Sequence, residues 1–501
     1  MNRPAPQLDD QTLADVQGIV TTGYGHLPEV AYVFVNIERV ETGQAWINRL
    51  MSCITSSAPW PMGGDGRVIK PSVAVDLTFT ADGLRALGLP GEVLRTFPPE
   101  FQEGIAARSQ ILGDTDMSAP EQWEFGGPAT PSVHAVLLLF AGDAAALEDL
   151  CRLQREMMDD SGVTLAAGVQ YGYRPGSASE PFGFRDGMGQ PRIAGLEGSG
   201  VPTGEFILGY ENHYGLIPPT PVVARELDPT ESLTAFANPY YAEKGLRDLG
   251  RNGSYMVYRK LQQDVAGFWQ FMRHEAARHV EATDDRMIWL ASKCIGRWPS
   301  GTSLMLSPDH DNQTLGNRDD FLYADDAEGL RCPLGAHVRR TNPRDVLKPY
   351  PVPQSLSMTE AHRLLRRGRV YGPPLFDAAS LHRGSPDRAP LADIRDDGQL
   401  RGIHFVALNA SLKSQFEFVQ QTWCNNAHFG GLTDNTDPLL TMRRADDDPP
   451  TRMTIPVASG TVRTAPLPNF VTVKAGAYLF VPSLTAVRFL ASVGGKTVAR
   501  R

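Results

Sequence analysis

The chain has 501 residues and a formal net charge of −9, with 42% hydrophobic and 21% charged residues. This composition excludes a disordered chain, and the length predicts two large domains because domains usually span about 100–200 residues. No lysine-rich or arginine-rich block stands out, which argues against a nucleic-acid partner. The net negative charge instead favours solubility.

The N-terminal segment and the cysteines predict a cytoplasmic protein. The segment MNRPAPQLDDQTL has no apolar run and no twin arginine, so it does not have the pattern of a secretory signal. The longest apolar stretch, residues 133–140, is too short to span a bilayer, so no membrane partner is expected. The five cysteines are widely spaced and form no CxxC pair, which disfavours a disulfide framework and a zinc ribbon.

Apolar periodicity in the first half of the chain predicts the order β-α-β-β-α-β. The strands are expected at residues 30–37, 72–79, 132–140 and 163–173. The helices are expected at residues 42–51 and 143–158, and the second of them repeats leucine at helical spacing.

The second half of the chain repeats this order. Strands are expected at residues 254–261, 336–341, 402–410 and 470–482. One helix follows the first of these strands, and another carries an apolar stripe formed by Leu412, Phe416, Val419 and Trp423.

The repeated order predicts an α+β protein built from tandem ferredoxin-like (split βαβ) domains with antiparallel sheets. We expect an N-terminal domain at residues 14–183, a connector at residues 184–252 and a C-terminal domain at residues 253–501. The second copy contains two long inserts, residues 300–332 and 344–368. Long ordered inserts often build a functional site.

Three segments contain candidate functional residues. In GFRDGMGQP (residues 183–191), Asp186 either caps a turn or faces a flat ligand, which the adjacent Gly187 would allow to approach the backbone. In CPLGAHVRRTNPRD (residues 332–345), His337 is either a structural histidine or an axial ligand with arginines beside it. The third segment, HRLLRRGRVYGPP (residues 362–374), is either a basic helix end or part of the same site.

Taken together, these segments resemble the dye-decolorizing peroxidases of the larger type found in bacteria and fungi. GFRDGMGQP matches the family's GxxDG signature, GAHVRR its proximal histidine segment and LLRRGRVYG its distal arginine segment. Further similar stretches occur in order along nearly the whole chain, among them DVQGIVTTGYGHLP, GEFILGYENHYG and FVTVKAGAYLFVP.

The resemblance implies a haem site mainly in the second domain. His337 would be the axial ligand of the iron in one haem b per chain, and Asp186 and Arg366 would handle peroxide on the opposite face. Peroxide cleavage needs a carboxylate that moves a proton between the two oxygens and a positive charge that stabilises the developing anion. Arg366 is suited to the second task because arginine stays protonated.

The resemblance also suggests supporting residues. Asp437, with Asp434 as the alternative, would accept the outer N–H of the axial histidine. Arg339 would bind a haem propionate. Phe405 and Leu408 would line the haem edge, or else belong to the ordinary core.

Two glycines depart from the family pattern. Gly368 stands where some subgroups carry a polar amide, which suggests that Asp186 and Arg366 act without a third polar partner. Gly189 replaces the usual serine or asparagine after the signature.

The implied function is a haem peroxidase that reduces hydrogen peroxide and oxidises dyes, phenolics or other small one-electron donors. A homo-oligomer is left open. One alternative is a haem carrier or iron-releasing protein of the same fold, and another is a haem-free interaction protein. The presence of both Asp186 and Arg366 favours the enzyme, because a carrier needs only His337 and a pocket.

Overall fold

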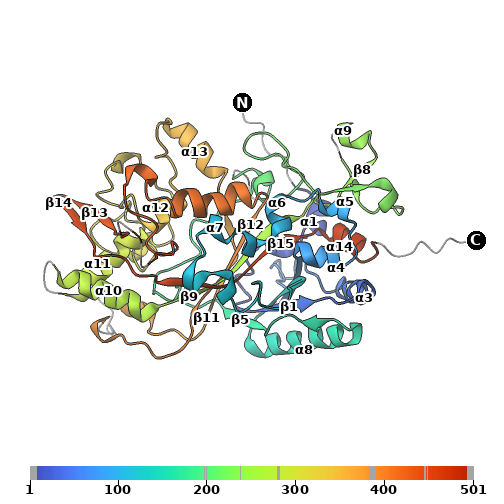
Figure 1. The fold of residues 1–501 in the computed structure, drawn as a ribbon, viewed down its shortest axis with the longest axis horizontal. Coiled ribbons are helices and arrows are strands. Elements are labelled where there is room, and N and C mark those ends of the chain that lie inside the picture. Colours follow the sequence, from blue (N-terminus) through green and yellow to red (C-terminus); the bar gives the residue numbers. More distant parts are fainter. Residues whose placement is uncertain are drawn as a thin grey trace, which may run out of the picture.

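The computed structural model describes residues 8–493 except 197, 199, 237–238, 279–281, 383–390, 445–446 and 448–449. The strands of the main sheet occupy the middle of the molecule (Figure 1). Helices of the first half, such as α3 and α8, lie on one side of them, and helices α10 to α13 of the second half lie on the other side. Among the described residues, no helix combines the length and the apolar character needed to cross a membrane.

The first half forms a four-stranded antiparallel sheet with the order β5-β1-β3-β2. The strands are β1 (Glu29–Asn36), β2 (Val73–Phe79), β3 (Ala135–Ala141) and β5 (Gln170–Tyr173), and the short β4 (Thr164–Leu165) also pairs with β1. Helices α3 (Val40–Leu50) and α8 (Ala144–Ser161) pack against each other, and α8 also contacts β3. The predicted order of elements is therefore confirmed, with the last strand divided into two pieces.

The second half repeats the arrangement with the order β15-β9-β12-β11. Its strands are β9 (Ser254–Gln263), β10 (Leu365–Arg366), β11 (Arg369–Tyr371), β12 (Gly402–Asn409) and β15 (Val471–Val481). Its connecting helices are α10 (Val265–Ala277) and the π-helical segments η10 (Lys413–Glu417) and η11 (Val419–Cys424), which carry the predicted apolar stripe.

The two sheets join edge to edge. Phe79 of β2 pairs with Phe480 of β15, and Tyr173 of β5 pairs with Val370 of β11. The pairings therefore form a closed cycle, which leaves few strand edges open to solvent. The predicted tandem ferredoxin-like fold is confirmed.

One predicted strand is wrong. Residues 336–341 do not form a strand, because His337–Thr341 form the short helix α12, whose Arg340 N–H donates to the Ala336 carbonyl. Weak alternation of apolar and polar residues over only six positions cannot distinguish a strand from one turn of helix. The corresponding place in the sheet is taken by β10 and β11, which lie in the segment with the distal arginine.

The remaining elements surround the two units. The helices are α1 (Asp10–Asp15), α2 (Gly18–Thr21), α4 (Ala81–Ala86), α5 (Gly91–Leu94), α6 (Pro99–Glu103), α7 (Ser109–Leu112), α9 (Pro239–Ala242), α11 (Asp284–Ile295), α13 (Val352–Glu360) and α14 (Leu484–Leu490). The strands are β6 (Val222–Ala224), β7 (Thr234–Ala235), β8 (Leu246–Asp248), β13 (Thr454–Val457) and β14 (Gly460–Arg463).

Candidate functional site

One cavity of about 270 Å³ brings the three candidate segments together. His337, Asp186 and Arg366 all line it, as does Phe405. Much of the remaining wall is apolar and comes from the second half of the chain, including Ile295, Val338, Ile403, Phe416, Val419 and Leu439. A largely apolar wall with one imidazole donor can accommodate a flat apolar ligand that accepts a bond from that imidazole.

His337 is held by a buried carboxylate. It is the first residue of α12, and its Nδ1 lies 2.9 Å from Oδ2 of Asp437. The carboxylate can only accept, so Nδ1 carries the proton and Nε2 remains free to bind another group. Burial raises the pKa of Asp437, but His337 and two backbone N–H donors outweigh burial and bring that pKa to about 2. Asp437 therefore stays ionised and fixes the orientation of the imidazole.

Asp434, the alternative to Asp437, does not contact His337. Its carboxylate pairs with Arg463 and accepts a hydrogen bond from Asn435.

Asp186 and Arg366 form an ion pair in the same cavity. Arg366 Nη1 lies 3.2 Å from Asp186 Oδ1, and both side chains are partly exposed. Arg366 is also fixed by the segment that follows Asp186: its backbone N–H donates to the Gln190 side chain, and its Nη2 donates to the Met188 carbonyl at 2.9 Å. The signature turn therefore holds both the carboxylate and the arginine.

The two unusual glycines have steric explanations. Gly189 has φ +66°, and a β-carbon there would lie 3.1 Å from both carboxylate oxygens of Asp319. Gly368 lines the cavity, and a β-carbon there would lie 2.5 Å from the carbonyl oxygen of His404. A larger residue at position 189 would have to adopt a left-handed conformation beside the Asp319 carboxylate, and one at position 368 would need a shift of the backbone.

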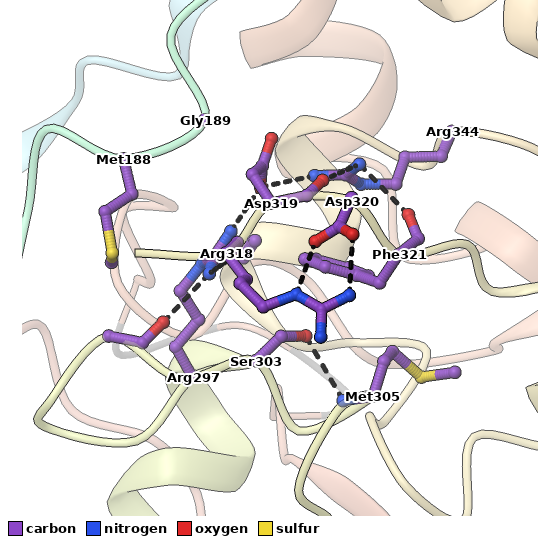
Figure 2. Close-up of polar contacts among 12 residues, drawn as sticks. Met188, Gly189, Arg297, Ser303, Met305, Arg318, Asp319, Asp320, Phe321 and Arg344 are labelled. Carbon is purple, nitrogen blue, oxygen red and sulfur yellow. Dashed lines mark hydrogen bonds and ion pairs between the residues drawn. The ribbon is translucent and has the colours of Figure 1, made fainter. Parts of the chain in front are cut away.

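Two arginines line another part of the cavity: Arg344, one of the arginines that follow His337 in the sequence, and Arg297, which the sequence did not single out. Figure 2 shows the Asp319 carboxylate between Arg297 and Arg344, and both arginines donate to it. Arg344 also donates to the backbone carbonyls of Asp319 and Phe321, at 2.9 and 3.0 Å. Its Nε is buried and makes no hydrogen bond to any described residue. Positive charge fixed in this way suits the carboxylates of a ligand.

Arg339, the predicted propionate partner, does not line the cavity. Its guanidinium is buried and donates to Asp326 at 3.0 Å and to the Cys332 carbonyl at 2.6 Å. Positions two apart on a helix differ by about 200° in direction, so Arg339 points away from the side on which His337 lies. Arg344, five residues further along the chain, occupies the cavity wall instead.

Leu408 also lies on the wrong face for the predicted role. Ile403 and Phe405 line the cavity, whereas Leu408 is fully buried in a core cluster with Val406. Side chains alternate along a strand, so residues three positions apart face opposite sides. Phe405 is brought into the site and Leu408 is not.

A second carboxylate, Glu180, lines the cavity near Asp186. It accepts hydrogen bonds from the backbone N–H groups of Phe182 and Phe184, both at 3.0 Å, and from Gln263 at 2.8 Å. Burial raises its pKa to about 7, partly opposed by these hydrogen bonds. Glu180 therefore fixes the turn that leads into Asp186. It had no distinctive sequence pattern that would have identified it.

These residues fit a haem. The imidazole of His337 has its outer N–H engaged and its other nitrogen free, as an axial ligand requires. The wall is largely apolar, and Arg297 and Arg344 offer guanidinium groups where carboxylates can bind.

Comparisons with known proteins point to one family. No family model matches the chain. A multifunctional dye peroxidase of Amycolatopsis is 30% identical over 423 residues, covering 82% of this chain and 81% of that protein. A dye-decolorizing peroxidase of Mycetinis scorodonius is 27% identical over 498 residues, covering 96% of this chain and 88% of that protein.

Solved structures agree with these relatives. A dye-decolorizing peroxidase in complex with 2,6-dimethoxyphenol has a TM-score of 0.71 at 26% identity, covering 96% of this chain and 99% of the other. A variant of the Auricularia auricula-judae enzyme has a TM-score of 0.72 at 24% identity, with coverage of 96% and 99%, and shows the shared fold. The chain therefore belongs to the dye-decolorizing peroxidase family and is a haem peroxidase of the larger, fungal-like type.

Proposed function

We propose that this protein holds one haem b through His337 and uses hydrogen peroxide to oxidise small one-electron donors such as dyes and phenols. The observation that carries the proposal is a single cavity lined by His337, with its buried partner Asp437, and by the Asp186–Arg366 pair. The solved relative with bound 2,6-dimethoxyphenol supports phenols as donors.

Three groups of this chain would hold the haem. His337 would bind the iron through Nε2, with Asp437 making the imidazole a stronger donor. Arg297 and Arg344 would bind the propionates, since Asp319 keeps both guanidinium groups in place. When bound, haem supplies the iron centre that binds peroxide and accepts electrons from the donor.

Asp186 would move the proton that peroxide cleavage requires. Its carboxylate accepts a proton from one peroxide oxygen and returns it to the other, so that the departing oxygen leaves as water. Arg366 stabilises the negative charge that develops on that oxygen, and the ion pair of 3.2 Å keeps Asp186 directed into the cavity. Gln190 and the Met188 carbonyl hold Arg366 while the proton moves.

A haem carrier of the same fold was the alternative that the sequence left open. A carrier needs the imidazole and the apolar wall, but it gains nothing from an arginine fixed beside a half-exposed carboxylate. The Asp186–Arg366 pair therefore favours the peroxidase.

Rapid mixing of the haem-loaded protein with hydrogen peroxide, followed by absorption, tests the proposal. The wild type should change its haem spectrum rapidly, and Asp186→Asn should bind haem normally but react about 10²–10⁴-fold more slowly. His337→Ala should fail to retain haem. Asp320→Asn is the matched control, because Asp320 is exposed and pairs with Arg318. An Asp186→Asn enzyme as fast as the wild type would exclude the proposed proton transfer, and protein that takes up no haem would exclude the haem site.

We further propose a cytoplasmic location. All five cysteines are free thiols, four of them buried, which suits a reducing compartment. Fractionation of the source cells with an antibody against the protein would test it, and recovery of the protein from the culture medium would contradict it.

A further inference from the structure

The methionine that follows the signature turn has no role in the proposed reaction, yet its side chain lies in the site. Met188 lines the same cavity as Asp186 and Arg366, two residues along the chain from Asp186. Its side chain extends from the segment that also carries Gly189 (Figure 2). Among the described residues that line the cavity, it is the only methionine.

The Met188 thioether fills a notch over Gly301. A β-carbon on Gly301, which has φ +93°, would overlap both Sδ and Cε of Met188. The turn beneath is firmly held: the Gly301 N–H donates to the Trp298 carbonyl at 2.8 Å, and the Gly301 carbonyl accepts from Arg297 at 2.8 Å. The thioether therefore fits here only because residue 301 has no side chain.

The backbone of Met188 supports the distal arginine. Its carbonyl accepts the hydrogen bond from Arg366 Nη2 at 2.9 Å, and the next carbonyl, that of Gly189, accepts from Arg363. A change that displaces the Met188 side chain from the notch over Gly301 would therefore also displace the acceptor that holds Arg366.

Hydrogen peroxide is able to oxidise a thioether directly. The sulfur attacks one peroxide oxygen, an S–O bond forms as the O–O bond breaks, and the other oxygen takes up the proton of the first and leaves as water. Sulfur loses two electrons and the peroxide gains them, so no further reactant is needed. Asp186 and Arg366 assist the same proton shift and charge development that they would provide for the main reaction.

We propose that Met188 is the site at which hydrogen peroxide inactivates this enzyme, because its polar sulfoxide packs poorly over Gly301 and withdraws the Met188 carbonyl from Arg366. The product is polar and larger than the thioether, and methionine sulfoxide reductases can reverse its formation. The enzyme thereby contains a reversible oxidation switch beside its own peroxide site. This inference rests on the proposed function in requiring peroxide to enter the cavity and Asp186 and Arg366 to assist its cleavage.

The other oxidisable groups are less suited to this role. Cys424 also lines the cavity, but burial and the nearby Asp437 raise the pKa of its thiol well above the usual value. The thiolate is the form that reacts with peroxide, so Cys424 should react slowly. Met62 and Met117 are 62% and 61% exposed and lie outside the cavity, so they report the unassisted rate of oxidation by peroxide.

Peptide mapping of the haem-loaded, full-length enzyme during exposure to hydrogen peroxide tests the proposal. Met188 should gain one oxygen atom in parallel with the loss of activity and ahead of Met62 and Met117. In Asp186→Asn, oxidation of Met188 should slow relative to these two internal references. Treatment of the inactivated wild type with methionine sulfoxide reductase should restore both Met188 and the activity.

Two matched variants separate the effect from general oxidation. With each variant normalised to its own initial rate, Met188→Leu should inactivate with a several-fold longer half-life, and Met117→Leu should inactivate like the wild type. Unmodified Met188 in inactivated enzyme, or equal half-lives for Met188→Leu and the wild type, would overturn the proposal. Protein with no peroxidase activity before exposure would instead contradict the proposed function, while oxidation of Met188 could still be measured.

Discussion

Replacing Asp76 with asparagine should make the protein more resistant to unfolding above neutral pH. Asp76 lies on β2 with its side chain fully buried, and its Oδ1 accepts the backbone N–H of Ile19 at 3.0 Å. Burial raises the pKa of Asp76 from 3.8 to about 7, although the Ile19 N–H and the Tyr24 hydroxyl oppose this shift.

The direction of the pH effect follows from the raised pKa. Between about pH 4 and pH 7, the folded protein keeps a proton on Asp76 that the unfolded chain has already released. The stabilisation of the folded state by this proton is fully present below the pKa of Asp76 in the unfolded chain. It is lost as the pH rises through the pKa of Asp76 in the folded protein. A shift of about three pKa units at about 1.36 kcal/mol each corresponds to about 4 kcal/mol.

Urea unfolding of the wild type and Asp76→Asn at about pH 4.5 and about pH 8 measures this difference. Asparagine keeps the acceptor for Ile19 but has no charge to bury, so the variant should gain about 3 kcal/mol relative to the wild type between the two pH values, which span most of the titration window. Asp82→Asn is the control, because Asp82 is exposed on α4 and pairs with Arg85. A difference between the wild type and Asp76→Asn that stays constant with pH would refute the reasoning.

Three further predictions concern the cavity. Asp437→Ala should weaken haem retention by about 10- to 100-fold, because His337 loses the acceptor of its outer N–H; transfer of haem to apomyoglobin measures this loss. Arg344→Leu should weaken haem binding about tenfold or more in a haem titration, because a hydrogen bond to a charged group contributes about 1.5–3 kcal/mol. Leu408→Ala should lower the free energy of unfolding by about 2–5 kcal/mol in urea without altering the haem spectrum, whereas Phe405→Ala should alter the spectrum. Unchanged haem binding in the first two variants, or a spectrum altered by Leu408→Ala, would contradict these assignments.

The long strands were predictable because each is buried or half-buried over many residues. Strands β1, β3, β9 and β15 carry runs of apolar residues, and the structure places them within a few residues of the predicted bounds. The order of elements then led to two ferredoxin-like units. Short segments were less predictable, because β10 and β11 have only two and three residues, and their pairing with β12 depends on the rest of the sheet.

The site residues that lie in short sequence motifs were predictable. Those contributed by segments without a motif were not. His337, Asp186 and Arg366 lie in dense local motifs, and Phe405 lies on a long strand. Arg297 follows α11, and Asp319 is brought into the cavity by the insert at residues 300–332, whose course has no periodic pattern. Arg339 and Leu408 were chosen by their nearness in sequence to site residues, but helical and strand geometry turns both away.

Under the proposed function, haem binding and peroxide handling draw on different units of the tandem fold. His337 and Asp437 both belong to the second unit and contact each other directly. Asp186, in contrast, follows β5 of the first unit, whereas Arg366 lies on β10 of the second. The pairing of Tyr173 with Val370, together with the hydrogen bond of 3.2 Å from the Tyr173 hydroxyl to the Gly372 carbonyl, joins the two units near this point. Weakening that junction should therefore separate Asp186 from Arg366 and slow peroxide cleavage before it releases haem from His337.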